Sequence, residues 1–314
     1  MVDCYFPKDF IQTAEGLVFA VVDQGLEQGK VLCFLRYVQQ DSFWKKLNTQ
    51  EANQLLAEYY PQYLFFSQVK SAALHAVNVQ SIVIHHKPKQ RLQDLLVKKN
   101  LDIIEQDFIA LCQMLLVQGI DLQDVGVTGS LLIGAQNFNS DIDLVIYSRE
   151  KFHRFRKEIK QLIQQNQLRQ LAEQDWLDSY QRRQCDLNYA DYVWHEQRKY
   201  NKGLINHRKF DLNLLELSAE EATPANYQKR GMMLIQTRVL DAHYGFDYPA
   251  KFLVEHEYVS EVICYTATYT GQAEQGECIE VSGQLEISST GRARILVGSS
   301  REAEGEYIKV LAFL

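Results

Sequence analysis

Hydrophobic and polar positions in the first third of the chain predict strands followed by a helix and another strand. Residues 16–22 and 31–38 are rich in β-branched and aromatic side chains and flank a run of turn-forming residues. A helix is expected to start at Thr49, with its hydroxyl as the cap. Residues 79–85 form another β-rich run, before a polar stretch that contains proline. We therefore predict an N-terminal α+β domain over residues 1–90.

The middle of the chain mixes helical and strand-like patterns. Apolar residues recur at helical spacing over 91–118, which predicts one or two amphipathic helices. Short strands are expected at 125–127 and 141–147, a helix over 152–163, and a strand with alternating polarity at 210–215. We place the end of this central domain near residues 220–224, so that it covers residues 91–222.

The last part of the chain, residues 223–314, reads as β-rich. Strand-like runs separated by glycine recur from about residue 252 onward, which suggests a small barrel or sandwich. The fold class expected for the whole chain is α+β.

Composition narrows the kind of protein but does not name it. Hydrophobic residues make up 46% and the formal net charge is -7, which is typical of a globular chain and unfavourable for coating nucleic acid non-specifically. The six cysteines are scattered and favour reduced thiols. We see no signal peptide and no apolar run near the roughly 20 residues needed to span a bilayer. We therefore expect a cytoplasmic protein without a membrane partner.

The most informative segment pairs a Gly-Ser turn with two closely spaced aspartates. Gly129 and Ser130 follow one predicted strand, and Asp141 and Asp143 lie on the next. Side chains alternate along a strand, so the two aspartates share one face. Two adjacent carboxylates repel unless a cation lies between them, and Mg²⁺ is typically held by one or two carboxylates together with phosphate and water. A glycine turn lets the backbone approach an anion closely.

This arrangement resembles the GS-x(n)-DxD motif of the DNA polymerase β-like nucleotidyltransferase superfamily. More loosely, the chain is similar to uncharacterised predicted nucleotidyltransferases best known from archaea. The resemblance implies a mixed sheet with helices, an NTP such as ATP as substrate, and two Mg²⁺ or Mn²⁺ ions. It implies metal binding by Asp141 and Asp143, and contact of Gly129, Ser130 and Ser140 with the nucleotide.

The resemblance also implies a third carboxylate on a later strand. Asp211, in the alternating run 210–215, is preferred to Asp186, which lies in a less regular stretch. The segment before Asp211 is locally basic, and we hypothesise that Lys202 or Arg208 contacts triphosphate or the acceptor.

The expected function is transfer of a nucleoside monophosphate to an acceptor hydroxyl with pyrophosphate release. An RNA end is slightly favoured over a small molecule or a protein as acceptor. The alternative is a catalytically idle module that senses nucleotides or binds a protein. A metal-dependent phosphodiesterase ranks last, because no histidine lies near Asp141. The sequence does not indicate the oligomeric state.

Overall fold

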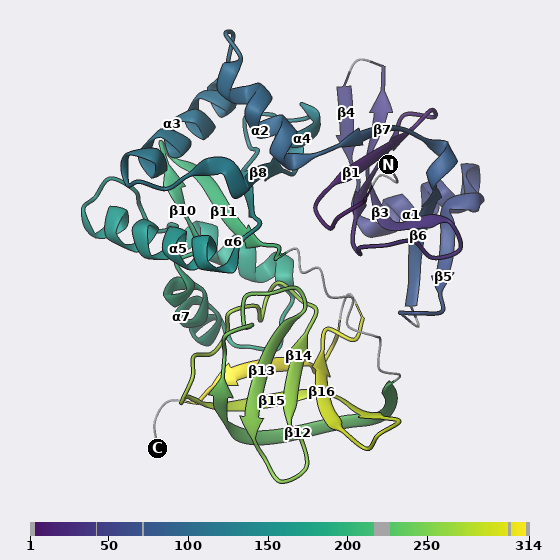
Figure 1. The fold of residues 1–314 in the computed structure, drawn as a ribbon, viewed down its shortest axis with the longest axis vertical. Helices are drawn as coiled ribbons and strands as arrows, with labels where there is room; N and C mark the ends of the chain where they lie inside the picture. Colours follow the sequence, from purple (N-terminus) through teal and green to yellow (C-terminus); the bar gives the residue numbers. More distant parts are fainter. Residues whose placement is uncertain (1–3, 42, 71, 217–226, 301–302, 312–314) are drawn as a thin grey trace. The chain divides into compact units, whose positions relative to one another are not determined.

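The computed structural model describes residues 4–41, 43–70, 72–216, 227–300 and 303–311 (Figure 1). The α+β class is confirmed, with three sheets in the described residues. The chain divides into two compact units, the first formed by Met1–Ile146 with Ile205–Asn213, and the second by Tyr147–Leu204 with Leu214–Leu314. Each sheet falls within one of the three predicted segments, but the domain boundaries stay predictions, and residues 220–224 lie outside the described residues.

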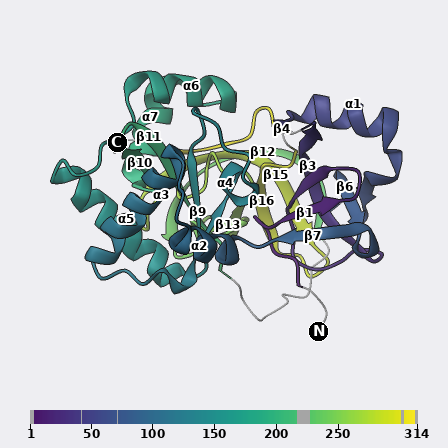
Figure 2. The same ribbon diagram turned by 90° about the horizontal axis from the view of Figure 1, so that it is seen from above.

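The N-terminal sheet has the strand order β5-β6-β3-β2-β1-β7, with β4 paired to β3. Its elements are β1 (Phe10–Thr13), β2 (Leu17–Val21), β3 (Lys30–Gln40), β4 (Phe43–Lys46), α1 (Thr49–Tyr59), β5 (Leu64–Ser67), β6 (Ala72–Asn78) and β7 (Ile82–His86). Helix α1 lies along this sheet (Figure 2), where Ala52 and Leu56 join the core of the strands. The predicted hairpin is confirmed as β2 and β3.

Two details of this region differ from the prediction. The cap of α1 is Asn48 rather than Thr49, because the Asn48 side chain accepts a hydrogen bond from the backbone N–H of Glu51. The run 79–85 begins with a 3₁₀ turn, so that strand β7 starts only at Ile82.

The next sheet has the order β10-β11-β9-β8. The elements of this region are α2 (Pro88–Val97), α3 (Ile103–Val117), β8 (Val125–Thr128), α4 (Ser130–Ile133), β9 (Ile142–Ile146), β10 (Lys202–Ile205) and β11 (Arg208–Leu214). The prediction of one or two helices over 91–118 is confirmed as α2 and α3. Pro88, in the polar stretch after β7, is the first residue of α2, a position at which proline is well tolerated. Asp102 and Glu105 form a capping box that starts α3.

The second unit combines helices with a six-stranded sheet. Its elements are α5 (Arg149–Gln164), α6 (Glu173–Arg183), α7 (Tyr189–Lys199), β12 (Tyr227–Asp241), β13 (Ala250–Glu255), β14 (Glu261–Cys264), β15 (Cys278–Ser288), β16 (Ala293–Val297) and β17 (Tyr307–Val310). Strand β12 pairs with both β13 and β15, so the pairings of five strands form a closed circuit. Trp176 and Tyr192 from the helices pack in one core with sheet residues such as Phe252 and Val281.

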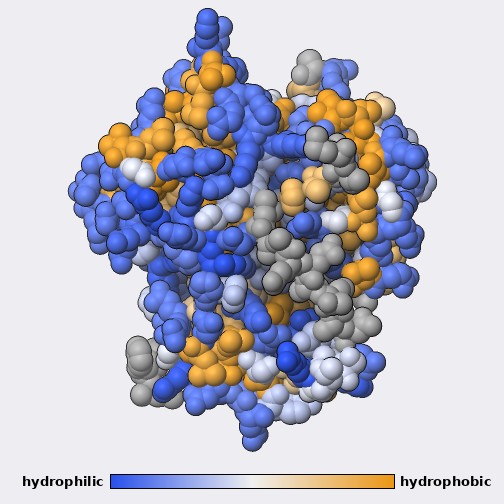
Figure 3. Space-filling model, viewed as in Figure 1, coloured by the Kyte–Doolittle hydropathy of each residue, from blue (hydrophilic) through white to orange (hydrophobic). Residues whose placement is uncertain are grey.

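The surface agrees with the ordinary composition of the chain. On the face drawn in Figure 3, hydrophilic side chains predominate and hydrophobic ones form separate patches. None of the helices in the described part of the chain combines the length and apolar composition that crossing a bilayer requires.

Candidate active site

The turn after β8 brings Gly129 against Asp143. Strands β8 and β9 are antiparallel, with Thr128 opposite Asp143, so the chain leaves β8 beside that carboxylate. Gly129 has φ +67°, a conformation that favours glycine, and an added Cβ would overlap Asp143 Oδ2. Ser130 then opens the single turn of α4. Both the backbone conformation and the close approach therefore require glycine at the point where the two halves of the motif meet.

The two aspartates lie at the start of β9. Asp141 directly precedes the strand and Asp143 is its second residue, while Ile142 and Leu144 are fully buried. The alternation of side chains expected along this strand is therefore confirmed, with Ile142 and Leu144 on the core side. A strand held by its apolar residues in this way presents Asp143 from a rigid element.

Asp211 lies near this pair, on the strand that adjoins β9. In β11, Phe210 and Leu212 are buried and Asp211 alternates with them, as the sequence pattern predicts. Burial raises the pKa of Asp143 to about 6, and the negative charges of Asp211 and Asp141 contribute to the increase. The structure thus brings the three carboxylates into one electrostatic environment.

One oxygen of Asp211 has no hydrogen-bond partner. Its Oδ1 is buried, and no donor contacts it within the described residues. A buried carboxylate oxygen without a donor is costly, and a bound cation or hydroxyl would relieve that cost. Asp186, the alternative, belongs to the second unit, where its carboxylate accepts a hydrogen bond from the Gly305 backbone at 2.8 Å.

Two lysines of the N-terminal sheet region also act on this site, and sequence analysis missed them. The positive charges of Lys8 and Lys46 oppose the increase in the pKa of Asp143. Lys8 Nζ donates to Asn213 Oδ1 at 3.1 Å, and the Lys8 carbonyl accepts a hydrogen bond from Thr128 Oγ1 at 2.8 Å. Lys8 has φ 77°, an uncommon conformation for a residue with a side chain. Backbone strain of this kind is often found at functional sites.

Packing explains how residues so distant in sequence come to share a site. Phe10 and Tyr37 of the N-terminal sheet and Leu132 of α4 form one buried cluster, within the first compact unit. Burial raises the pKa of Tyr37 to about 12, with a small contribution from the charge of Asp143. The N-terminal sheet is therefore part of the wall of the candidate site.

Arg208 holds the loop that leads into Asp141. Its Nε donates to Asp107 Oδ2 at 2.7 Å, and its Nη1 donates to the carbonyls of Ser140 at 2.8 Å and Phe138 at 3.0 Å. The Ser140 hydroxyl accepts a hydrogen bond from the backbone N–H of Asn137 at 2.9 Å. These hydrogen bonds show that Arg208 positions the loop that contains Phe138 and Ser140. Contact of Arg208 or Ser140 with nucleotide stays a prediction.

Lys202 belongs to a buried ion cluster. Its Nζ donates to Glu196, which also accepts from Lys199 Nζ at 2.5 Å. Burial opposes ionisation of Glu196, but the charges of Lys199 and Lys202 hold its pKa below the usual value. The predicted contact of Lys202 with triphosphate stays a prediction.

The donor set suits a hard divalent cation completed by substrate. Within the described ranges, no three Asp, Glu, His or Cys side chains are arranged to hold an ion by themselves. Mg²⁺ commonly takes only one or two carboxylates and completes its shell with water and substrate phosphates. The charge repulsion among Asp141, Asp143 and Asp211, with the free oxygen of Asp211, fits such a partial site.

Comparisons with known proteins agree with the geometry. Residues 110–209 match the family model described as "Nucleotidyltransferase domain". The match includes the Gly-Ser turn, Asp141 and Asp143, and it ends two residues before Asp211. The chain is also 34% identical over 334 residues to an uncharacterized protein of Methanocaldococcus jannaschii, MJ1086, covering 96% of this chain and 98% of that protein. No solved structure is significantly similar.

Proposed function

Because this chain belongs to the nucleotidyltransferase-domain family, we propose that it transfers a nucleoside monophosphate from an NTP to an acceptor hydroxyl. The acceptor oxygen attacks the α-phosphorus, the bond from that phosphorus to the bridging oxygen breaks, and pyrophosphate leaves. The observation that carries this proposal is the gathering of Asp141, Asp143 and Asp211 beside the Gly129 turn.

Each carboxylate has a part in this proposal. Asp141 and Asp143 would hold Mg²⁺ or Mn²⁺, with help from Asp211. The bound ions would stabilise negative charge on the attacking and leaving oxygens of an in-line displacement. Asp211 also has a free Oδ1, which can accept a hydrogen bond from the attacking hydroxyl and help to remove its proton.

Cations and backbone then bind the triphosphate. Lys8 and Lys46 supply positive charge near Asp143 and are suited to phosphate oxygens. Gly129 lets the backbone come close to the nucleotide, and Ser130 and Ser140 are kept as further nucleotide contacts. Arg208 maintains the loop before Asp141 through the carbonyls it binds.

We keep an RNA end as the first acceptor to test, ahead of a small molecule or a protein. The circuit of five strands in the six-stranded sheet of the second unit supports this order only by analogy, because the five-stranded OB-fold is one β-barrel that binds oligonucleotides. The charges on this sheet are less favourable for binding RNA. Arg294 of β16 forms an ion pair with Glu286 at 2.8 Å and lies over the ring of Tyr227.

The proposal is tested by incubating the protein with each α-labelled NTP, Mg²⁺ or Mn²⁺ and total cellular RNA. Label in RNA that is lost in the Asp141→Ala/Asp143→Ala variant supports transfer to RNA. Pyrophosphate release without labelled RNA supports transfer to another acceptor. If the protein forms neither product and does not bind NTP in a metal-dependent way, the proposal is overturned. The alternative of a catalytically idle interaction module then remains.

Two single variants separate the candidate third carboxylates. Asp211→Asn removes the carboxylate beside Asp143 and is expected to abolish pyrophosphate release. Asp186→Asn changes a residue of the second unit that accepts a hydrogen bond from the Gly305 backbone, and it is expected to keep activity. The reverse pattern would show that the third carboxylate has been assigned wrongly.

A further inference from the structure

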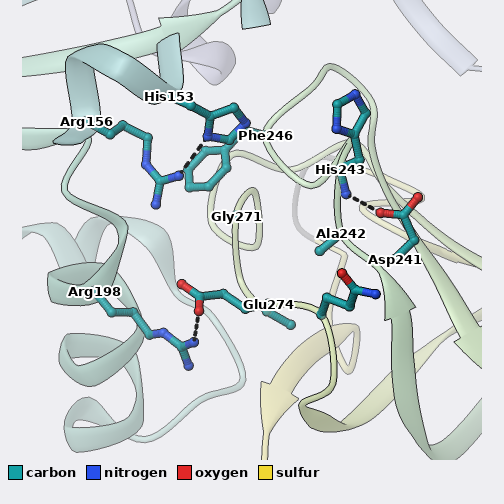
Figure 4. Close-up of a pocket in the computed structure, with 11 residues that line it drawn as sticks. His153, Arg156, Arg198, Asp241, Ala242, His243, Phe246, Gly271 and Glu274 are labelled. Atoms are coloured by element: carbon teal, nitrogen blue, oxygen red, sulfur yellow. Dashed lines mark hydrogen bonds and ion pairs between the residues drawn. The ribbon is translucent and has the colours of Figure 1, made fainter. Parts of the chain in front are cut away.

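The second unit contains a pocket that the proposed reaction does not use. It has a volume of about 320 Å³ and is lined by α5, α7 and the loops that follow β12 and precede β15 (Figure 4). Its lining includes His153, Arg156, Arg198, His243, Phe246 and Glu274. All lining residues belong to the second compact unit. The volume is large enough for a small organic ligand.

Arg156 makes no ion pair with a residue of the described part of the chain, although the negative charge of Glu274 in the lining acts on it. Its Nε donates to the Lys199 carbonyl at 2.6 Å, its Nη1 bonds His153 Nδ1 at 3.1 Å, and the guanidinium lies 3.9 Å from the centre of the Phe246 ring. No carboxylate in the described part of the chain is within ion-pair distance of it, and Nη2 makes no hydrogen bond there. Burial lowers the pKa of Arg156 to about 10.

Arg198 adds a second guanidinium to the lining. Its Nη2 donates to Glu277 Oε1 at 2.5 Å, and the group lies 4.5 Å from the Trp194 ring. Its Nη1 is buried and has no hydrogen-bond partner within the described residues. Both arginines are thus held in place by other contacts, and Arg156 keeps unused N–H donors on Nη2 that can bind an oxyanion.

The acidic residues of the lining lie beyond ion-pair distance of Arg156, and the charge of Glu274 offsets its positive charge only in part. Glu274 is exposed and lies 3.8 Å from Arg198, and Asp241 accepts a hydrogen bond from the His243 backbone at 2.7 Å. Figure 4 shows Asp241 on the side of the pocket opposite Arg156. The positive side of the pocket is therefore formed by Arg156 with His153 beside it.

Phe246 and Gly271 give the pocket an apolar wall next to these cations. An added Cβ at Gly271 would overlap the Phe246 ring, so the backbone packs directly on the aromatic face. Gly271 N–H also donates to the Gly245 carbonyl at 2.6 Å. A ligand with an anionic group and a less polar body matches a lining of this kind.

We propose that this pocket binds a phosphate-bearing small molecule, with its phosphate on the guanidinium group of Arg156. A phosphate group has enough oxygens to accept the free N–H donors of Arg156 Nη2. The proposal does not depend on nucleotidyl transfer.

The test is calorimetric titration with inorganic phosphate, pyrophosphate and ribose 5-phosphate. EDTA is present, so that metal-dependent nucleotide binding at the aspartate site cannot contribute. Wild-type protein is expected to bind at least one probe saturably, and Arg156→Gln to bind it at least about tenfold more weakly, because a charge-assisted bond is lost. Lys157→Gln removes an exposed cation from the same helix outside the pocket, and is expected to bind like wild type.

Two further measurements locate the bound ligand and distinguish an organic phosphate from inorganic phosphate. The chain has eight histidines, and the ring signals of His153 and His243 in NMR spectra should shift on binding. Arg156→Lys keeps the charge but loses donors, and serves if Arg156→Gln does not fold. Tighter binding of ribose 5-phosphate than of inorganic phosphate identifies an organic phosphate, and the reverse a free inorganic ion. Absence of saturable binding, unchanged affinity in the Arg156 variants, or unmoved histidine signals would overturn the proposal.

Discussion

Replacing Asp143 by asparagine should stabilise the metal-free protein while removing its activity. The pKa of this carboxyl rises from 3.8 to about 6 on folding, because it is buried near Asp211 and Asp141. The folded state therefore holds a proton more tightly than the unfolded state, and the stability falls as the pH rises from about 4 to about 6. Above that range the folded protein bears the full cost of the ionised carboxylate.

The size of this cost follows from the pKa change. About two pKa units correspond to about 3 kcal/mol, at 1.36 kcal/mol for each unit. The asparagine amide must find its own hydrogen-bond partners, so we expect Asp143→Asn to gain about 1–3 kcal/mol at pH 8 in EDTA. At pH 4.5 the wild-type carboxyl is mostly protonated, and the gain should fall below about 1 kcal/mol.

Urea unfolding followed by tryptophan fluorescence measures this difference. Of the three tryptophans, Trp44 lies in the first unit, so a Trp176→Phe/Trp194→Phe background reports on the unit that contains Asp143. Adding Mg²⁺ with NTP should stabilise the protein with Asp143 and not the Asp143→Asn variant, because ligand binds only the folded state. A variant no more stable than its parent at pH 8, or equally stabilised at both pH values, would refute the reasoning.

Three further variants examine other parts of the site. Gly129→Ala should lose transfer activity and about 1–3 kcal/mol of stability by urea unfolding, whereas Gly134→Ala, also at positive φ but in open space, should lose only about 1 kcal/mol and keep activity. Lys8→Gln should raise the pKa of Asp143, seen by NMR titration of the metal-free protein, and an unchanged pKa would contradict the placement of Lys8. Arg208→Lys should lower kcat about tenfold with little change in the KM for NTP, since it loosens the loop before the aspartates; a raised KM at constant kcat would instead indicate phosphate contact.

Local patterns allowed much of the candidate site to be predicted. Alternation on β9 and β11 placed Ile142, Leu144 and Phe210 in the core, and the positions of Asp143 and Asp211 follow from it. Helical spacing identified α3 in the same way. These predictions succeeded because each depends on residues only a few positions apart on one rigid element.

Features that depend on tertiary contacts had no such signal. Lys8 reaches the site through packing of Phe10 against Leu132, more than a hundred residues away, and its positive φ leaves no mark in the sequence. Strand β12 was not predicted, because its first half is exposed and includes charged residues with Gly231. The basic run before Asp211 suggested Arg208 as a phosphate ligand. The sequence could not show that the Arg208 guanidinium binds the backbone carbonyls of Phe138 and Ser140.

Comparison of α-labelled and γ-labelled NTP tests the central claim most directly. The protein is incubated with RNA and Mg²⁺ or Mn²⁺, and both the RNA and the released phosphates are analysed for label. If the protein transfers a nucleoside monophosphate, the α-label enters the acceptor and the γ-label leaves as pyrophosphate, and both products are lost in Asp141→Ala/Asp143→Ala. Transfer of the γ-label to the acceptor, or no reaction with any NTP and acceptor tried, would contradict it.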